Sequence, residues 1–132
     1  MTPAQGNAMT IRHWIIAAAF AGVLSGAAPA LAQERSPAER QGLVDLARLL
    51  GESHALNQAC VSADDQSWRA RMQGMLNQEA GEQGLTTRLS IAFNEGYHSG
   101  QALYPKCSEA ARAEARKLAA KGELLSEKLA GP

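Results

Sequence analysis

The chain has 132 residues, of which 13 are basic, 13 are acidic and 45% are hydrophobic. This length predicts one domain. The balanced charge, with no basic cluster, excludes an electrostatic footprint for nucleic acid or for an anionic membrane surface.

Residues 1–32 have the pattern of a cleavable signal peptide. Arg12 precedes an apolar run over residues 14–24, and Ala30-Leu31-Ala32 supplies the small residues that signal peptidase requires. The run is shorter than the roughly 20 residues of a membrane span. We expect cleavage after Ala32, with Met9 as the natural start, and an uncleaved anchor as the alternative. The remaining domain, residues 33–132, has 12 basic and 13 acidic residues, a net charge of −1. It is expected to be periplasmic or secreted, with no stable membrane span.

Two helices are expected in the first half of this domain. Ser36-Pro37-Ala38-Glu39 is typical of a capped helix start, and this helix should end before Cys60. A polar link, residues 62–65, can cap the second helix. Gly81 and Gly84 mark the turn that follows. The apolar positions at helical spacing are Leu43, Leu46, Ala47, Leu50 and His54 in the first helix, and Trp68, Met72, Met75 and Leu76 in the second.

Two further helices are expected in the second half. Pro105 stops the third helix, and Ser108 can cap the fourth. Gly96 and Gly100 are spaced for close helix approach, and we expect them to pack against Ala111 and Ala115. The apolar stripes are Leu85, Leu89, Ala92, Phe93, Gly96, Gly100 and Leu103 in the third helix, and Ala111, Ala115, Leu118, Gly122, Leu125 and Leu129 in the fourth.

The fold class predicted from these elements is all-α, a small up-down bundle of four helices. Short links favour antiparallel neighbours, so the first and third helices should end on the same side. Cys60 follows the first helix and Cys107 the third. An even cysteine pair in an exported chain indicates a disulfide. Closing this loop is worth about 4 kcal/mol on the chain-entropy model.

The sequence carries no strong catalytic or metal-binding motif. No C-x-x-C, H-x-x-x-H or G-x-S-x-G pattern is present. His54 lies on an apolar face, where a structural histidine is the simpler interpretation. Glu79 and Glu95 are the two carboxylates that could act as an acid pair, but nothing in the sequence fixes the distance between them. We therefore expect no enzymatic activity, no cofactor and no metal.

Four residues form a candidate binding surface: Arg69, Asn94, Tyr97 and Tyr104. Arg69 lies at the edge of an apolar face and can hold a carboxylate. Asn94 is a poor residue for a helix interior, which indicates a contact outside its own helix. The alternative is structural, with a surface cation, an amide that pins a loop, and tyrosines that pack with only the hydroxyl wet.

Several segments together resemble a family of short exported alphaproteobacterial proteins of unknown function. The resemblance spans about residues 43–130. It implies an envelope location, a helical domain and a paired cysteine set, and it brings no reaction, cofactor or ligand. The segments that carry it are Leu50-Gly51-Glu52-Ser53-His54, Cys60, Trp68-Arg69-Ala70-Arg71-Met72, Asn77-Gln78-Glu79-Ala80, Ala92-Phe93-Asn94-Glu95-Gly96-Tyr97 and Tyr104-Pro105-Lys106-Cys107.

The expected function is that of a non-enzymatic envelope protein that binds another protein or an envelope component. One alternative is a periplasmic small-molecule or metal binding module with a cavity near His54. An envelope hydrolase is a third class, and it would need a convergent acid/base pair in a cleft.

Overall fold

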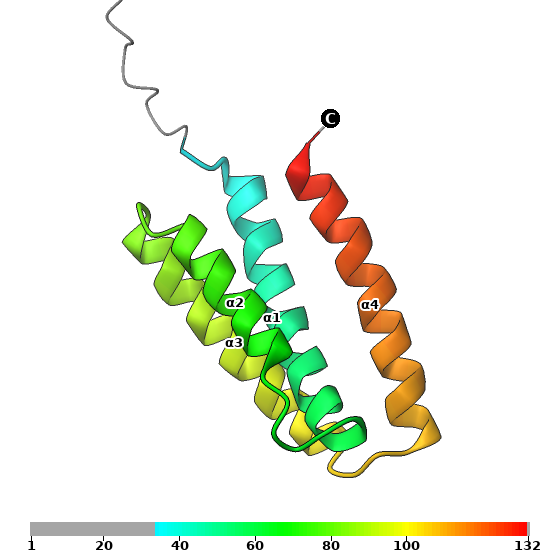
Figure 1. Cartoon of the computed structure of the whole chain (residues 1–132). Helices are drawn as coiled ribbons and strands as arrows, with labels where there is room; N and C mark the ends of the chain where they lie inside the picture. Colours follow the sequence, from blue (N-terminus) through cyan, green and yellow to red (C-terminus); the bar gives the residue numbers. More distant parts are fainter. Residues whose placement is uncertain (1–33, 132) are drawn as a thin grey trace, which may run out of the picture. The chain divides into compact units, whose positions relative to one another are not determined.

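The structure is a computed structural model that describes residues 34–131. It consists of four α-helices, α1 (Pro37–Cys60), α2 (Ser67–Gln78), α3 (Gln83–Leu103) and α4 (Glu109–Ala130), which alternate in direction along the chain (Figure 1). A disulfide joins Cys60 and Cys107. The predicted all-α fold with one disulfide is thus confirmed. The predicted signal peptide, residues 1–32, lies outside the described residues. None of the described helices is long and apolar enough to span a membrane.

Local sequence sets the helix ends. The Ser36 hydroxyl accepts a hydrogen bond from the Glu39 amide (3.2 Å), and the Ser36 amide donates to the Glu39 carboxylate (2.7 Å), so the predicted capping box is formed. At the other end of α1, the prediction that the helix stops before Cys60 is wrong. The Val61 amide still donates to the Asn57 carbonyl (2.8 Å), which keeps Cys60 inside the last turn. The predicted turn after α2 is also shorter than expected, because Gly84 already belongs to α3.

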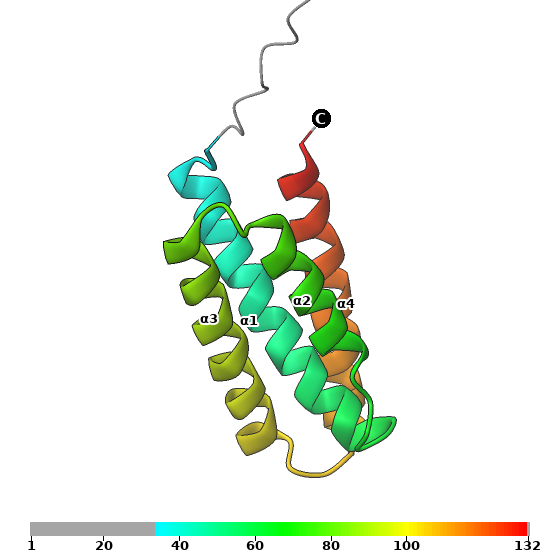
Figure 2. The same ribbon diagram turned by 60° about the vertical axis from the view of Figure 1, so that its left-hand side comes forward.

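Helix α1 is the centre of the domain. Within residues 34–131, α1 packs against each of the other three helices, α2 makes a small contact with α3, and α4 packs against α1 alone. Figure 2 shows α1 lying between α3 and α4. Two apolar clusters therefore form on different sides of α1. The first joins α1, α2 and α3 through Leu43, Ala47, Leu50, Met72, Met75, Leu85, Leu89, Ala92 and Phe93, and the second joins α1 and α4 through Leu49, Leu56, Ala111 and Leu118.

The contact between α1 and α3 is a backbone contact made possible by glycine. A Cβ placed on Gly51 would overlap the Phe93 carbonyl oxygen, and one placed on Gly96 would overlap the Arg48 carbonyl oxygen. Each helix thus packs its glycine against the main chain of the other. Such an approach offsets the loss of helix propensity that glycine brings, about 1 kcal/mol per residue relative to alanine.

Gly100 belongs to the same contact. A Cβ at Gly100 would lie 2.8 Å from the Ala55 Cβ on α1. The expectation that Gly96 and Gly100 pack against Ala111 and Ala115 is therefore wrong, because α4 lies on the far side of α1. Leu103, expected on the same stripe, is 70% exposed, since it is the last residue of α3 and extends past this contact.

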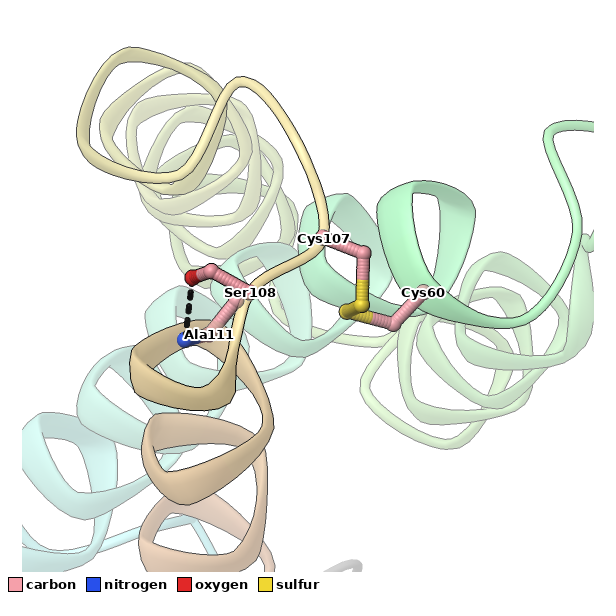
Figure 3. Close-up of a disulfide and its surroundings, with 4 residues drawn as sticks. All are labelled: Cys60, Cys107, Ser108 and Ala111. Carbon is pink, nitrogen blue, oxygen red and sulfur yellow. Dashed lines mark hydrogen bonds between the residues drawn. A yellow bond between two sulfur atoms is a disulfide. The ribbon is translucent and has the colours of Figure 1, made fainter.

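The disulfide continues the register of the two parallel helices. Arg48 pairs with Glu95 (2.6 Å) at a sequence separation of 47, and Cys60 is bonded to Cys107 at the same separation. The chain enters α4 directly after Cys107, where the Ser108 hydroxyl accepts from the Ala111 amide (3.0 Å; Figure 3). The first turn of α4 is therefore fixed to the last turn of α1.

We predict that Gly96→Ala destabilises the domain. The added methyl meets backbone, which cannot rotate away, and overpacking of this kind costs about 1–3 kcal/mol. That cost exceeds the gain of up to about 1 kcal/mol from helix propensity. Thermal unfolding followed by circular dichroism should show a melting temperature lower by at least a few degrees.

Gly74→Ala is the matched control for this substitution. Gly74 lies inside α2, and a Cβ there meets nothing within 4 Å. This variant should gain up to about 1 kcal/mol. An unchanged or raised melting temperature for Gly96→Ala would contradict the backbone contact.

Candidate functional site

A groove runs between α2 and α4, with α1 as its floor. It has a volume of about 670 Å³ and exists because α2 and α4 do not meet. Pockets of about 300–1,000 Å³ are typical of small-molecule sites. The floor consists of Leu43, Leu46, Leu49 and Leu50; the α2 wall of Trp68, Arg71, Gly74, Met75, Gln78 and Glu79; and the α4 wall of Leu118, Ala119, Gly122, Glu123, Ser126, Leu129 and Ala130, with Arg35 at one end.

An ion pair closes the end of this groove near the start of α1. Arg35 donates to both carboxylate oxygens of Glu79, from Nη2 (2.8 Å) and from Nε (3.2 Å). Glu79 is 6% exposed, so the pair satisfies a buried charge. The hydrogen bond to Glu79 raises the pKa of Arg35 above its usual value. Glu95 instead pairs with Arg48 on the surface. The two carboxylates that the sequence offered as an acid pair thus serve two separate arginines.

The wall formed by α2 carries an aromatic ring and a cation. The Arg71 guanidinium lies over the Trp68 ring at 5.1 Å from its centre, which is within the range of a cation–π interaction. Trp68 is half-buried against the first apolar cluster. Sequence analysis placed Trp68 in the core and passed over Arg71, although its place three residues after Trp68 on a helix was a usable signal.

His54 lies on another side of α1 and is fully buried. Its ring lies 5.9 Å from the Phe93 ring and 5.2 Å from the Tyr97 ring, and neither ring nitrogen has a hydrogen-bond partner among the described residues. The charged groups that act on it are Arg69 on α2 and Asp65 in the link before α2. Burial, followed by the charge of Arg69, lowers the pKa of His54. The expected cavity beside His54 does not coincide with the groove, whose lining does not include this residue.

The four residues of the predicted binding surface have different surroundings in the structure. Arg69 and Tyr97 lie near His54, where the Tyr97 hydroxyl donates to the Gln58 side chain (2.7 Å). Tyr104 packs against the cluster that joins α1 and α4. Asn94 is exposed on α3. None of the four lines the groove.

Glu52 is a titratable group that sequence analysis did not single out. It is half-buried on α1 and lines a smaller hollow of about 360 Å³ between α1 and α4. Burial raises the pKa of Glu52, and the charge of Glu114 on α4 raises it further. The partial burial of Glu52 could not be predicted from the sequence. Most leucines of α1 fit a single helical face, so a second apolar side of this helix, the one that packs against α4, was not expected.

Comparison with known proteins gives a family. Residues 37–131 match the family described as "Protein of unknown function (DUF2385)". The chain belongs to this family. The match begins at the first residue of α1 and includes all four helices, so it is slightly longer than the resemblance predicted over residues 43–130. The predicted membership of a family of unknown function is confirmed. No curated protein and no solved structure matches the chain.

We predict that His54 makes the domain less stable in mild acid. Because burial lowers its pKa, the unfolded chain binds a proton more readily than the folded domain as the pH falls below about 6.5. The contribution of neutral His54 to the free energy of unfolding should therefore be fully present above this pH and be lost progressively towards pH 5. His54→Leu removes the buried nitrogens, so its melting temperature should change less than that of the wild type between pH 7 and pH 5.

His98→Gln is the control, since it removes an exposed histidine on α3. Its melting temperature should follow pH as the wild type does. If His54→Leu lost as much stability between pH 7 and pH 5 as the wild type, the buried histidine would not be the cause.

Proposed function

We propose that this protein is a non-enzymatic binding protein of the cell envelope and that its binding site is the groove between α2 and α4. The observation that carries the proposal is a groove of about 670 Å³ between α2 and α4, with leucines of α1 at its base and four charged residues in its lining. An apolar floor with a few polar groups at the rim is the usual make-up of a ligand site.

An envelope location is supported by two features. One is the signal-peptide pattern of residues 1–32, which the sequence alone provides. The other is the disulfide between Cys60 and Cys107, a bond that persists in oxidising compartments such as the periplasm. The partner is then an envelope protein or an envelope component.

The non-enzymatic character is supported by how the titratable groups are distributed. Among residues 34–131, the groups whose pKa is shifted are those of Arg35, Glu39, Glu52, His54 and Asp65, and of these only Arg35 lines the groove, where it is bound to Glu79. An active site instead gathers such groups in one cleft. His54, the most buried of them, is closed to any substrate at 0% exposure.

Small-molecule binding is the second candidate, and the volume of the groove favours it. Metal binding has no comparable support, since the described residues include no group of three or more His, Cys, Asp and Glu side chains that could hold an ion. The predicted surface of Arg69, Asn94, Tyr97 and Tyr104 is less favoured, because none of these residues lines the groove.

Photo-crosslinking in the periplasm tests the groove directly. A photoreactive amino acid at Ser126, which lines the groove on α4, should give an adduct that mass spectrometry identifies. The same amino acid at Lys117, an exposed position of α4 outside the groove, is the control. We expect adduct formation at Ser126 to exceed that at Lys117 at least tenfold. Equal yields at the two positions would overturn the proposal.

A further inference from the structure

Two charged residues that line the groove have no ion-pair partner among residues 34–131. Four charged residues line the groove, and two of them, Arg35 and Glu79, pair with each other. Arg71 on α2 and Glu123 on α4 make no ion pair within 4.0 Å with each other or with any other described residue. The groove thus offers one cation and one anion that form no ion pair among the described residues, and they lie on opposite walls.

From this arrangement we infer that the groove holds a single-chain zwitterionic amphiphile, namely one alkyl chain with a phosphate and an ammonium in its head group. This inference rests on the proposed function and specifies its ligand. The phosphate lies at Arg71, the ammonium lies towards Glu123, and the alkyl chain follows the leucines of the floor.

The cation is suited to a phosphate. A guanidinium presents a fork of N–H donors that matches the oxygens of a phosphate. Stacking of Arg71 over the Trp68 ring (5.1 Å) restricts its side chain before a ligand arrives, which reduces the entropy lost on binding. Glu123 is exposed on the opposite wall and attracts a cationic group in the same head group.

The apolar part of the groove is suited to a chain rather than to a broad ring system. Its floor follows α1 from Leu43 to Leu50, a length of about 10 Å at the rise of an α-helix. The walls carry small side chains at Gly74 on α2 and at Ala119 and Ser126 on α4, which leave room in the slot. Gly122 instead packs closely against Leu49 of the floor. Transfer of each methylene from water to such a surface is worth about 0.8 kcal/mol.

Binding can be measured through Trp68, because it lies in the groove wall. The chain has two tryptophans, so Trp14→Phe leaves Trp68 as the sole reporter whether or not residues 1–32 have been removed. Protein prepared from the periplasm is titrated with three amphiphiles of one chain length below their micellar concentrations. These are lysophosphatidylethanolamine (zwitterionic), lysophosphatidylglycerol (anionic) and monoacylglycerol (uncharged).

The charge variants give a pattern specific to the inferred ligand. Arg71→Gln should raise the Kd of both phospholipids about tenfold, the effect of losing a charge-assisted contact of about 1.4 kcal/mol. Glu123→Gln should weaken the zwitterionic ligand severalfold and strengthen or leave unchanged the anionic one. Neither variant should change binding of the uncharged ligand. Arg112→Gln, an exposed arginine of α4 outside the groove, is the control and should change none of the three.

A steric variant separates failure of this inference from failure of the proposed function. Gly74→Leu adds a side chain where a Cβ meets nothing within 4 Å, so it should fill the groove without disturbing the fold, and Gly74→Ala is its control. Loss of all three ligands in Gly74→Leu, with no effect of Arg71→Gln and Glu123→Gln, would keep the groove as the binding site and overturn the zwitterionic head group. The amphiphile would be overturned as the ligand if binding persisted in Gly74→Leu, or if lysophosphatidylethanolamine did not bind to the wild type. Whether the groove is a binding site at all is decided separately, by the crosslinking at Ser126.

Discussion

The rest of the structure depends on the parallel register of α1 and α3. Glycine lets the two helices approach until main chain meets main chain, at Gly51 against Phe93 and at Gly96 against Arg48. Contacts of this kind leave little freedom to slide, since a shift of one helical turn, about 5.4 Å, would bring side chains into the positions that only glycine can occupy. The register therefore also fixes where the two helices end.

The disulfide and the position of α4 follow from that register. Because α1 and α3 end together, Cys60 and Cys107 come within 4.8 Å between their Cα atoms. The chain then starts α4 at the last turn of α1 and returns along the side of α1 that α3 does not occupy. Here Leu49 and Leu56 meet Ala111 and Leu118 in a cluster separate from the main core.

The open groove is the consequence of this division into two clusters. With α2 and α3 on one side of α1 and α4 on the other, no helix of residues 34–131 fills the space between α2 and α4. Four leucines of α1 line its floor. Leu43, Leu49 and Leu50 are 5–7% exposed and Leu46 is half-buried, so these side chains belong to the core and form the base of the groove. The groove itself lies above them, between the walls of α2 and α4.

The elements that the sequence could predict were those determined locally. Ser36, Glu39 and Ser108 act through hydrogen bonds within their own turn, so capping rules placed the starts of α1 and α4 correctly. The predicted cap of α2 from residues 62–65 is wrong, because the N-cap is Gln66 and makes no side-chain capping bond. The cysteine pairing could also be predicted, because it follows from the order of the helices and from the even number of cysteines. The packing partner of Gly96 and Gly100 could not be predicted from the sequence, because both α1 and α4 carry small residues that would allow a close approach to these glycines.

The candidate site was harder to predict than the fold. Arg69, Asn94, Tyr97 and Tyr104 were selected for unusual residue types, and none of them lines the groove. A groove has no residue signature of its own, because it is defined by two helices that fail to meet. Arg71 and Glu123 are ordinary surface charges in the sequence, and only their places on facing walls distinguish them.

Among residues 34–131, α4 packs only against α1 and is tied to its last turn by the disulfide. Hydrogen–deuterium exchange of the wild type and of Cys60→Ser/Cys107→Ser, read helix by helix, tests this arrangement most directly. Loss of the disulfide should remove protection from the amides of α4, while the amides around Gly51 and Gly96 stay protected. An equal loss of protection in all four helices, or an α4 that stays as protected as in the wild type, would contradict it.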